Sequence, residues 1–249
     1  MRIRFEQDEG YCAAALGLIV LTTDETLEPE IAPCLAKSGV AAYHSRIKSD
    51  PDVTPETLLQ MEADLPRAAG MLPDSAKLKA VAYGCTSGAT VIGPERIEAL
   101  VQTSHPGVPV TNPLTAVLAA CRSLGVMRLG LLTPYVPSVS SAMQKVIEQQ
   151  GITISAFASF EQQEERTVAR ISEVSVLAAL CELGQGDCDA VFASCTNLRS
   201  FSIIDAAEAK IGKPVLSSNS ALLWHLGQLS GYPVGGPGRL FAQGLSQDA

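Results

Sequence analysis

The chain has 249 residues, of which 47% are hydrophobic and 18% are charged. This balance is typical of a folded globular protein and excludes disorder as the main state. The formal net charge is −8, and no cluster of Lys or Arg stands out, so we expect no nucleic-acid partner. The seven Cys residues include no CxxC pair, which argues against a zinc site or a disulfide framework and favours a reducing, cytoplasmic location.

The longest apolar run, residues 11–21, is too short to cross a bilayer. Acidic residues precede it, where a secretory leader would carry basic ones, so we expect neither a leader nor a membrane partner. The run is predicted to hold the first buried strand.

Short apolar runs alternate with longer amphipathic stretches along the chain. The predicted strands cover residues 16–21, 78–84, 108–111, 129–133, 152–157, 190–194 and 214–217. The predicted helices cover residues 54–69, 95–102, 114–124, 139–150, 173–183 and 203–211. The apolar runs lack a two-residue alternation, which is typical of parallel strands buried on both faces, so the sequence predicts an α/β fold.

Three motifs of the first half recur in the same order in the second half. LGLI at 16–19 matches LGLL at 129–132, AVAYGCT at 80–86 matches AVFASCT at 190–196, and GVPVTN at 107–112 matches GKPVLSSN at 212–219. The repeat predicts two pseudo-symmetric lobes, 1–122 and 123–249, each a mostly parallel sheet flanked by helices, with the active site in the cleft between them. The last helix is a candidate to pack back on the first lobe.

Cys85 and Cys195 occupy matched places in the repeat, each at the end of a strand and before a Thr and an expected helix. Open parallel sheets bind ligands at this edge. The helix dipole is expected to lower the pKa of each thiol. A single buried Cys is usually a small hydrophobe, which is our interpretation of the other five, but a pseudo-two-fold axis would bring this pair into one cleft.

Two thiols on opposite faces of a substrate carbon can move a proton without a cofactor, one as the thiolate base and the other as the acid. Alternatively, one thiolate adds to an activated double bond, and the adduct rotates before it eliminates. Both routes build negative charge on the substrate. The backbone N–H groups after each Cys are candidate stabilisers of that charge, together with the side chains of Thr86, Ser87, Thr196 and Asn197.

Several ordered motifs carry a family resemblance: LGLIV at 16–20, YGCTS at 83–87, LTPY at 132–135, SCT at 194–196, PVLSS at 214–218 and GRL at 238–240. With them the chain resembles the aspartate/glutamate racemase superfamily, within it the branch of maleate cis-trans isomerase and arylmalonate decarboxylase. The resemblance implies a cofactor-independent cytoplasmic enzyme that acts on a small carboxylate and assembles as a homodimer or homotetramer.

The resemblance also implies roles for individual residues. Cys85 and Cys195 would be the catalytic pair, and Tyr135, in the first loop of the second lobe, would hydrogen-bond a substrate carboxylate; the alternative for Tyr135 is an aromatic residue of a surface loop. Asp24 and Glu165 fall where maleate isomerases carry Asn residues that hold substrate.

Both departures from Asn have alternative interpretations. Asp24 is also a candidate helix N-cap, and Glu165 lies in an acidic run that is typical of a solvated face. A poorly solvated carboxylate at 24 would repel the maleate dianion, whereas an ammonium or amide group would suit it better. Residues 18–26 also resemble racemase-like proteins encoded with ectoine-utilisation enzymes.

We therefore expect an isomerase or racemase of a small carboxylate, either an amino-acid derivative or a dicarboxylate. Maleate isomerase proper is one alternative. Others are a small-molecule binding protein without chemistry and a decarboxylase or hydrolase that uses one Cys. Arylmalonate decarboxylases keep only the second Cys, so the presence of both Cys85 and Cys195 favours an isomerase.

Overall fold

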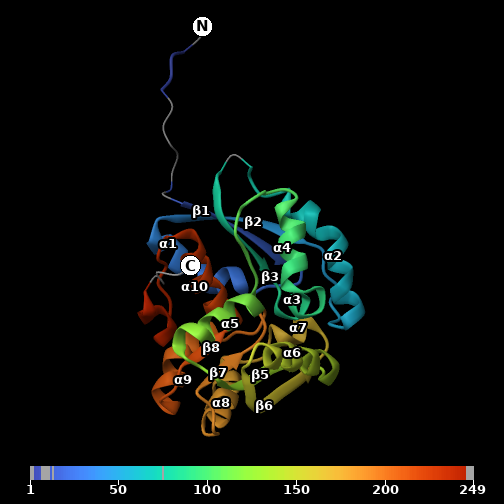
Figure 1. The fold of residues 1–249 in the computed structure, drawn as a ribbon, viewed down its shortest axis with the longest axis vertical. Coiled ribbons are helices and arrows are strands. Elements are labelled where there is room, and N and C mark those ends of the chain that lie inside the picture. Colours follow the sequence, from blue (N-terminus) through green and yellow to red (C-terminus); the bar gives the residue numbers. More distant parts are fainter. Residues whose placement is uncertain (1–2, 7–11, 13, 75, 245–249) are drawn as a thin grey trace.

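The computed structural model describes residues 3–6, 12, 14–74 and 76–244. They form two four-stranded sheets with the same strand order, β2-β1-β3-β4 and β6-β5-β7-β8, and every pairing within them is parallel. Figure 1 shows one sheet in the upper half of the molecule and the other in the lower half, with helices around both. The predicted α/β fold is confirmed.

The strands of the first sheet are β1 (Ala14–Leu21), β2 (Val40–Ile47), β3 (Leu78–Gly84) and β4 (Val110–Thr111). Those of the second are β5 (Arg128–Tyr135), β6 (Thr153–Gln162), β7 (Ala190–Ala193) and β8 (Val215–Ser217). The central strands β1 and β7 are buried along their whole length, as expected for strands covered on both faces. Residues 11 and 13 of the predicted first apolar run lie outside the described residues.

The helices of the first half are α1 (Leu27–Ser38), α2 (Pro55–Ala69), α3 (Thr86–Ile92), α4 (Pro94–Gln102) and α5 (Pro113–Leu124). The second half contains α6 (Pro137–Gln149), α7 (Glu165–Val168), α8 (Glu173–Gly184), α9 (Ile204–Ile211) and α10 (Ser218–Ser230), with short 3-10 helices η1 (Phe201–Ile203) and η2 (Arg239–Gln243). All six predicted helices are present, with bounds within two residues of those expected.

Two elements of the first half, β2 and α1, have no counterpart among the predictions. β2 is an edge strand with exposed positions in its centre, so it lacks the continuous apolar run of a buried strand. α1 contains Pro33, which normally argues against a helix interior. It forms because Leu27, Ile31 and Leu35 recur every four residues and bury one face.

The internal repeat is visible in the local structure. In β1, Gly17 pairs with Val81, and at the matched place in β5, Gly130 pairs with Val191. The last strand of each sheet then ends at a side chain that caps the next helix. Asn112 accepts from Thr115 N at the start of α5, and Ser217 accepts from Ser220 N at the start of α10.

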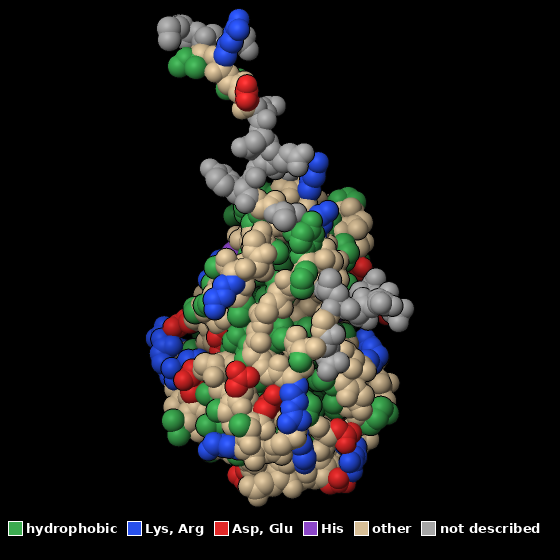
Figure 2. Space-filling model, turned by 90° about the vertical axis from the view of Figure 1, so that its left-hand side faces the viewer, with side chains coloured by type: hydrophobic (Ala, Val, Ile, Leu, Met, Phe, Trp, Pro, Cys, Tyr) green, Lys and Arg blue, Asp and Glu red, His purple; other side chains and the backbone are tan. Residues whose placement is uncertain are grey.

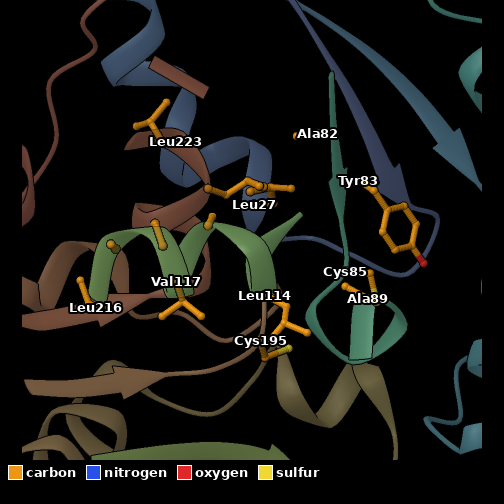
Figure 3. Packing of buried hydrophobic residues seen from close by; sticks show 14 of the residues in the cluster. Leu27, Ala82, Tyr83, Cys85, Ala89, Leu114, Val117, Cys195, Leu216 and Leu223 are labelled. Atoms are coloured by element: carbon orange, nitrogen blue, oxygen red, sulfur yellow. The ribbon is translucent and has the colours of Figure 1, made fainter. Parts of the chain in front are cut away.

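Helix α10 carries contacts between the two halves. Its residues pack against β3 and α5 of the first half as well as β8 of the second. The fully buried Leu223 of α10 belongs to the same apolar cluster as Leu27, Leu114 and Leu216 (Figure 3). Full burial of one such side chain stabilises the fold by roughly 2 kcal/mol. The halves are therefore held together by apolar packing next to the two cysteine loops.

Within the described part of the chain, no helix has the length and apolar character that crossing a membrane requires. On the face seen in Figure 2, acidic and basic side chains are interspersed, without a continuous basic patch among the residues coloured there.

Candidate active site

Cys85 lies directly after β3 and serves as the N-cap of α3. Its Sγ accepts a hydrogen bond from Gly88 N (3.2 Å) and lies 3.6 Å from Ser87 Oγ. The approach is close because residue 88 has no side chain: a Cβ there would lie 3.0 Å from this sulfur and 2.5 Å from the Tyr83 hydroxyl. The GCTSG segment, residues 84–88, therefore packs closely around the sulfur atom of Cys85.

Cys195 lies two residues after β7, in the matched place of the repeat. Its φ of 127° is in a region that non-glycine residues rarely adopt, and such strain persists where the surrounding structure imposes it. Its Sγ accepts from Asn197 N (3.3 Å), so the backbone after Cys195 folds back on the sulfur.

Hydrogen bonds join the two cysteine loops, some of them through Ser218 at the start of α10. The Ser218 hydroxyl accepts from Cys195 N (2.9 Å) and lies 2.8 Å from Thr86 Oγ1. The two loops also bond to each other directly, because Thr196 Oγ1 donates to Gly84 O (3.4 Å). The ends of β3 and β7 therefore meet between the two halves, and Figure 3 shows Cys85 and Cys195 among the buried residues of this region.

Both thiols share the same charged and hydroxyl groups. Ionisation of Glu165 would raise the pKa of Cys85 and of Cys195, and both thiols act electrostatically on the Tyr135 hydroxyl. The Tyr135 hydroxyl lowers the pKa of Cys195, and the Tyr83 hydroxyl, which donates to Met61 Sδ (3.5 Å), lowers that of Cys85, in both cases by less than burial raises it. The structure thus brings the predicted pair together, with one buried tyrosine at each sulfur.

The predicted decrease of the thiol pKa is wrong for this structure. Burial raises the pKa of Cys85 to about 12 and that of Cys195 well above its usual value. The N–H donors to each sulfur lower the pKa, but their effect is smaller than the cost of desolvating a thiolate. Each cysteine is only 3% exposed, and burial favours the protonated form of both thiols at neutral pH.

Asp24 is buried beside the start of α1. Its Oδ1 accepts from Thr26 N (2.8 Å) and Leu27 N (2.9 Å), but the N-cap residue of α1 is Thr26, two residues after the predicted one. Burial raises the pKa of the carboxyl despite these bonds and a favourable charge on Arg46. Burial is the largest cause of the raised pKa of Cys195, and the charge of Asp24 adds to it.

Glu165 is 4% exposed, so the interpretation of its acidic run as a solvated face is wrong at this position. The start of α7 turns it inward, and its Oε2 accepts from Asn197 Nδ2 (2.9 Å). Burial raises the pKa of Glu165 to about 7. Asn197 also donates to Thr23 O and accepts from Glu25 N, so its amide joins Glu165 to the loop that carries Asp24.

Tyr135 is the last residue of β5 and is 1% exposed, so its predicted place in a loop is wrong. The strand continues through Pro134, because Tyr135 still pairs with Gln162 of β6 after a register shift. Burial raises the pKa of Tyr135 well above its usual value, which keeps the hydroxyl a proton donor.

Three residues were not among the predicted site residues: Tyr83 and Ser218, which lie beside the cysteine loops, and Glu30, which interacts with Asp24. Tyr83 and Ser218 stand in the YGCTS and PVLSS motifs, so their place beside repeated segments is the signal that pointed to them. Glu30 Oε1 accepts from Ser200 N (2.9 Å) and Phe201 N (3.1 Å), and its Oε2 from Asn219 Nδ2. Nothing local in the sequence marks Glu30, because its partners lie far along the chain.

The site is closed in this structure. Residues 51–53 of the first half pair with residues 163–165 of the second, through Val53 N to Gln163 O (2.9 Å) and Glu165 N to Pro51 O (2.9 Å). A cavity beneath Glu165 has a volume of about 10 Å³, about the size of one water molecule. This pairing joins the two halves beside Glu165.

Replacing Ser218 by Ala is expected to lower the free energy of unfolding by about 2 kcal/mol, because it leaves the buried Cys195 N–H without a partner. Urea denaturation measures the change. Ser230→Ala is the control, since that hydroxyl, in the same helix, bonds to near neighbours in the chain: it donates to Gly227 O and accepts from Tyr232 N. Equal stability of the two variants would show that the Ser218 bridge contributes nothing.

A family model described as arylmalonate decarboxylase matches residues 52–241. The chain belongs to this family. The match includes both cysteine loops and Glu165 but begins after Asp24. Within the arylmalonate decarboxylase family the chain is also similar to maleate isomerases, as the sequence resemblance indicated.

The chain is 29% identical over 240 residues to the maleate isomerase of Nocardia farcinica, covering 92% of this chain and 95% of the relative. The structure of maleate cis-trans isomerase from that organism bound to Tris has a TM-score of 0.85 and 28% identity, over 92% of this chain and 98% of the other. A Cys-to-Ser variant of that enzyme, at a TM-score of 0.84 and 26% identity over the same shares, holds a covalently bound succinylcysteine intermediate. These relatives confirm the predicted branch and agree with the prediction of an isomerase that uses cysteine.

Proposed function

We propose that the protein is a cofactor-independent isomerase of a small carboxylate, with Cys85 and Cys195 as its acid and base or its nucleophile. The observation that carries the proposal is the direct bonding of the two cysteine loops through Ser218 and Thr196. The electrostatic effect of Glu165 on both thiols, and of both thiols on Tyr135, supports a shared site. One substrate can then meet both sulfur atoms.

In the proton-transfer route, the thiolate of one cysteine removes the proton from the substrate α-carbon. The electron pair moves into the carboxylate to give an enediolate, and the other thiol returns a proton to the opposite face. The first cysteine ends as the thiol and the second as the thiolate. The substrate is racemised, and no oxidation or reduction takes place.

In the addition route, one thiolate forms a C–S bond to a carbon of a substrate double bond. The π electrons move to the neighbouring carbon and its carboxylate, the other thiol donates a proton to that carbon, and rotation about the resulting single bond follows. The thiolate left at the second cysteine takes the proton back, and cleavage of the C–S bond restores the double bond in the other geometry and releases the first thiolate. The succinylcysteine intermediate of the Nocardia farcinica enzyme supports this route for the present chain.

Polar groups around the sulfurs suit both routes. Gly88 N and Asn197 N point at the two sulfur atoms and stabilise a thiolate. We assign the hydroxyls of Thr86, Ser87 and Thr196, with Tyr135, to the substrate carboxylate, whose charge grows in both transition states. Tyr135 contacts Cys195 in the closed site, so this assignment includes a change of partner when substrate binds.

Incubation in deuterium oxide with maleate, aspartate, glutamate, hydantoins and N-acetyl-diaminobutyrate tests the proposal. NMR and chiral chromatography then measure deuterium at the α-carbon and the configuration of the product. Exchange with inversion supports proton transfer, whereas conversion of maleate to fumarate supports the second candidate, maleate isomerase proper, which the relatives favour. Binding without any conversion would indicate a small-molecule binding protein. Loss of CO₂ from a substrate would indicate a decarboxylase.

We also propose that the chain works in the cytoplasm as a homodimer or homotetramer, and that its lobes divide at residues 122 and 123. The resemblance supports the oligomer, and the seven free cysteines support a reducing compartment. Light scattering after gel filtration tests the oligomeric state. The similarity to ectoine-utilisation proteins stays a prediction.

A further inference from the structure

Buried carboxyls surround the Cys195 loop. Asp24 and Glu165 are each 4% exposed, and Asn197 links them through its bonds to Glu165 Oε2 and to residues 23 and 25. Thr26 Oγ1 also donates to Asn197 O (3.0 Å), which fixes the Asp24 loop on the segment after Cys195. Two acidic side chains, from different parts of the chain, therefore lie beside the segment that follows one of the two thiols.

One of the two carboxylate oxygens of Asp24 is not hydrogen-bonded within the described residues. Its Oδ1 is engaged at the start of α1, but Oδ2 is buried and has no hydrogen-bond partner among the described residues. The Thr196 hydroxyl lies close enough to favour the charged form of the Asp24 carboxyl, and it donates to Gly84 O (3.4 Å). A buried carboxylate oxygen without a donor is costly, so this atom is available to a donor brought by a ligand.

The two carboxyls also act on each other and on the thiols. Asp24 raises the pKa of Glu165, both raise the pKa of Cys195, and Glu165 raises that of Cys85. The partly buried Glu30, one helical turn into α1, is a further acid that interacts with Asp24. Every charge among these groups is negative when they ionise.

Positive charge is scarce around this cluster. Arg46 acts on Asp24, but its Nη1 bonds the carbonyls of Leu21 and Asp24, and its Nη2 pairs with Glu28. Among the described residues, no Lys or Arg is a cause of the pKa shifts of Glu165, Cys85 or Cys195. Nor do the described residues include a group of three or more acids, His or Cys arranged to hold a metal ion. An organic cation therefore suits the cluster better than a metal.

We propose that Asp24 and Glu165 form a subsite for the ammonium group of an amino-acid-like substrate, whose carboxylate lies toward the thiols. The proposal rests on the proposed function and names its substrate class. An ammonium between the two carboxyls supplies the donor that Asp24 Oδ2 lacks and a countercharge to both acids. A maleate dianion would instead add two charges of the same sign to the cluster.

The same ammonium would change the protonation of the cluster. A cation beside Asp24 and Glu165 favours their charged forms, so it lowers the pKa of each carboxyl. Because Glu165 has a pKa of about 7, part of it loses its proton when the cation binds at neutral pH. Binding should therefore release protons.

Calorimetric titration of the Cys195→Ala variant tests the subsite without turnover. The ligands are aspartate with succinate and glutamate with glutarate, matched pairs that differ only in the ammonium group. At least one ammonium ligand is expected to bind about tenfold or more tightly than its partner. Titration at pH 7 in two buffers of different ionisation enthalpy should show proton release for that ligand.

Asp24→Asn and Glu165→Gln, each made in the Cys195→Ala background, remove one charge each. Asn keeps an acceptor for Thr26 N and Leu27 N at the start of α1, and Gln keeps an acceptor for Asn197. Each variant should bind the ammonium ligand about tenfold more weakly than the Cys195→Ala parent does. Binding of the matched ligand without the ammonium group should not weaken, and Glu165→Gln should abolish proton release. Glu161→Gln, an exposed neighbour in β6, is the matched control and should change nothing. Thermal unfolding checks that all variants are folded.

The outcomes separate this proposal from the proposed function. Equal or tighter binding of the deaminated ligands, or no effect of either variant, overturns the ammonium subsite even if the wild-type enzyme isomerises maleate. Tight, charge-dependent binding of an ammonium ligand supports the subsite. If no compound then undergoes exchange or isomerisation with the wild-type protein, the proposed function is the part that fails.

Discussion

Cys195→Ala and Cys85→Ala are each expected to reduce turnover of the substrate by at least about 10³-fold, because each removes either the base or the acid of a two-thiol mechanism. Cys→Ser at either position should restore little, since a hydroxyl is a far weaker base and nucleophile at neutral pH. Initial rates from NMR or chiral chromatography measure the effect.

Cys121→Ala is the matched control for these variants. Cys121 is also fully buried, and burial also raises its pKa to about 12, but it lies inside α5 and the charge that acts on its pKa is that of Arg122. It should keep the wild-type rate. Wild-type rates in both Cys85→Ala and Cys195→Ala would refute the mechanism, and normal activity of Cys85→Ala alone would indicate chemistry by a single cysteine.

Glu30→Gln is expected to remove up to roughly 3 kcal/mol from the pH dependence of the free energy of unfolding between about pH 4.5 and 7. Burial raises the pKa of Glu30 from 4.5 in the free side chain to about 7 in the folded protein. The folded state then holds a proton that the unfolded state has released, so the wild-type protein loses stability as pH rises through this interval. A Gln side chain has no such proton.

Urea denaturation at a series of pH values from 4.5 to 8 measures this difference. Gln keeps an acceptor for Ser200 N and Phe201 N, so the segment after Cys195 stays anchored. Glu165 contributes a slope of the same sign, which remains in the variant. Glu161→Gln should retain the full wild-type slope. If Glu30→Gln does so as well, Glu30 is not protonated in the folded protein.

Local patterns were sufficient to predict most of the fold. The buried runs of β1, β3, β5 and β7 and the amphipathic α2 and α6 are determined by residues close together in sequence. The edge strand β2 and the Pro-containing α1 were missed because their stability comes from neighbours far along the chain. For the same reason Tyr135 was assigned to a loop although β5 extends through Pro134.

The sequence by itself determined the class of fold and, through its internal repeat, which two cysteines belong together. Only the tertiary structure decided their protonation and surroundings. A helix N-terminus predicts a lowered thiol pKa, but the pKa depends on total desolvation, and both thiols are buried between the halves. Likewise, an acidic run does not reveal which carboxylate turns inward. Glu165 does so because the pairing of residues 51–53 with 163–165 and the amide of Asn197 hold it there.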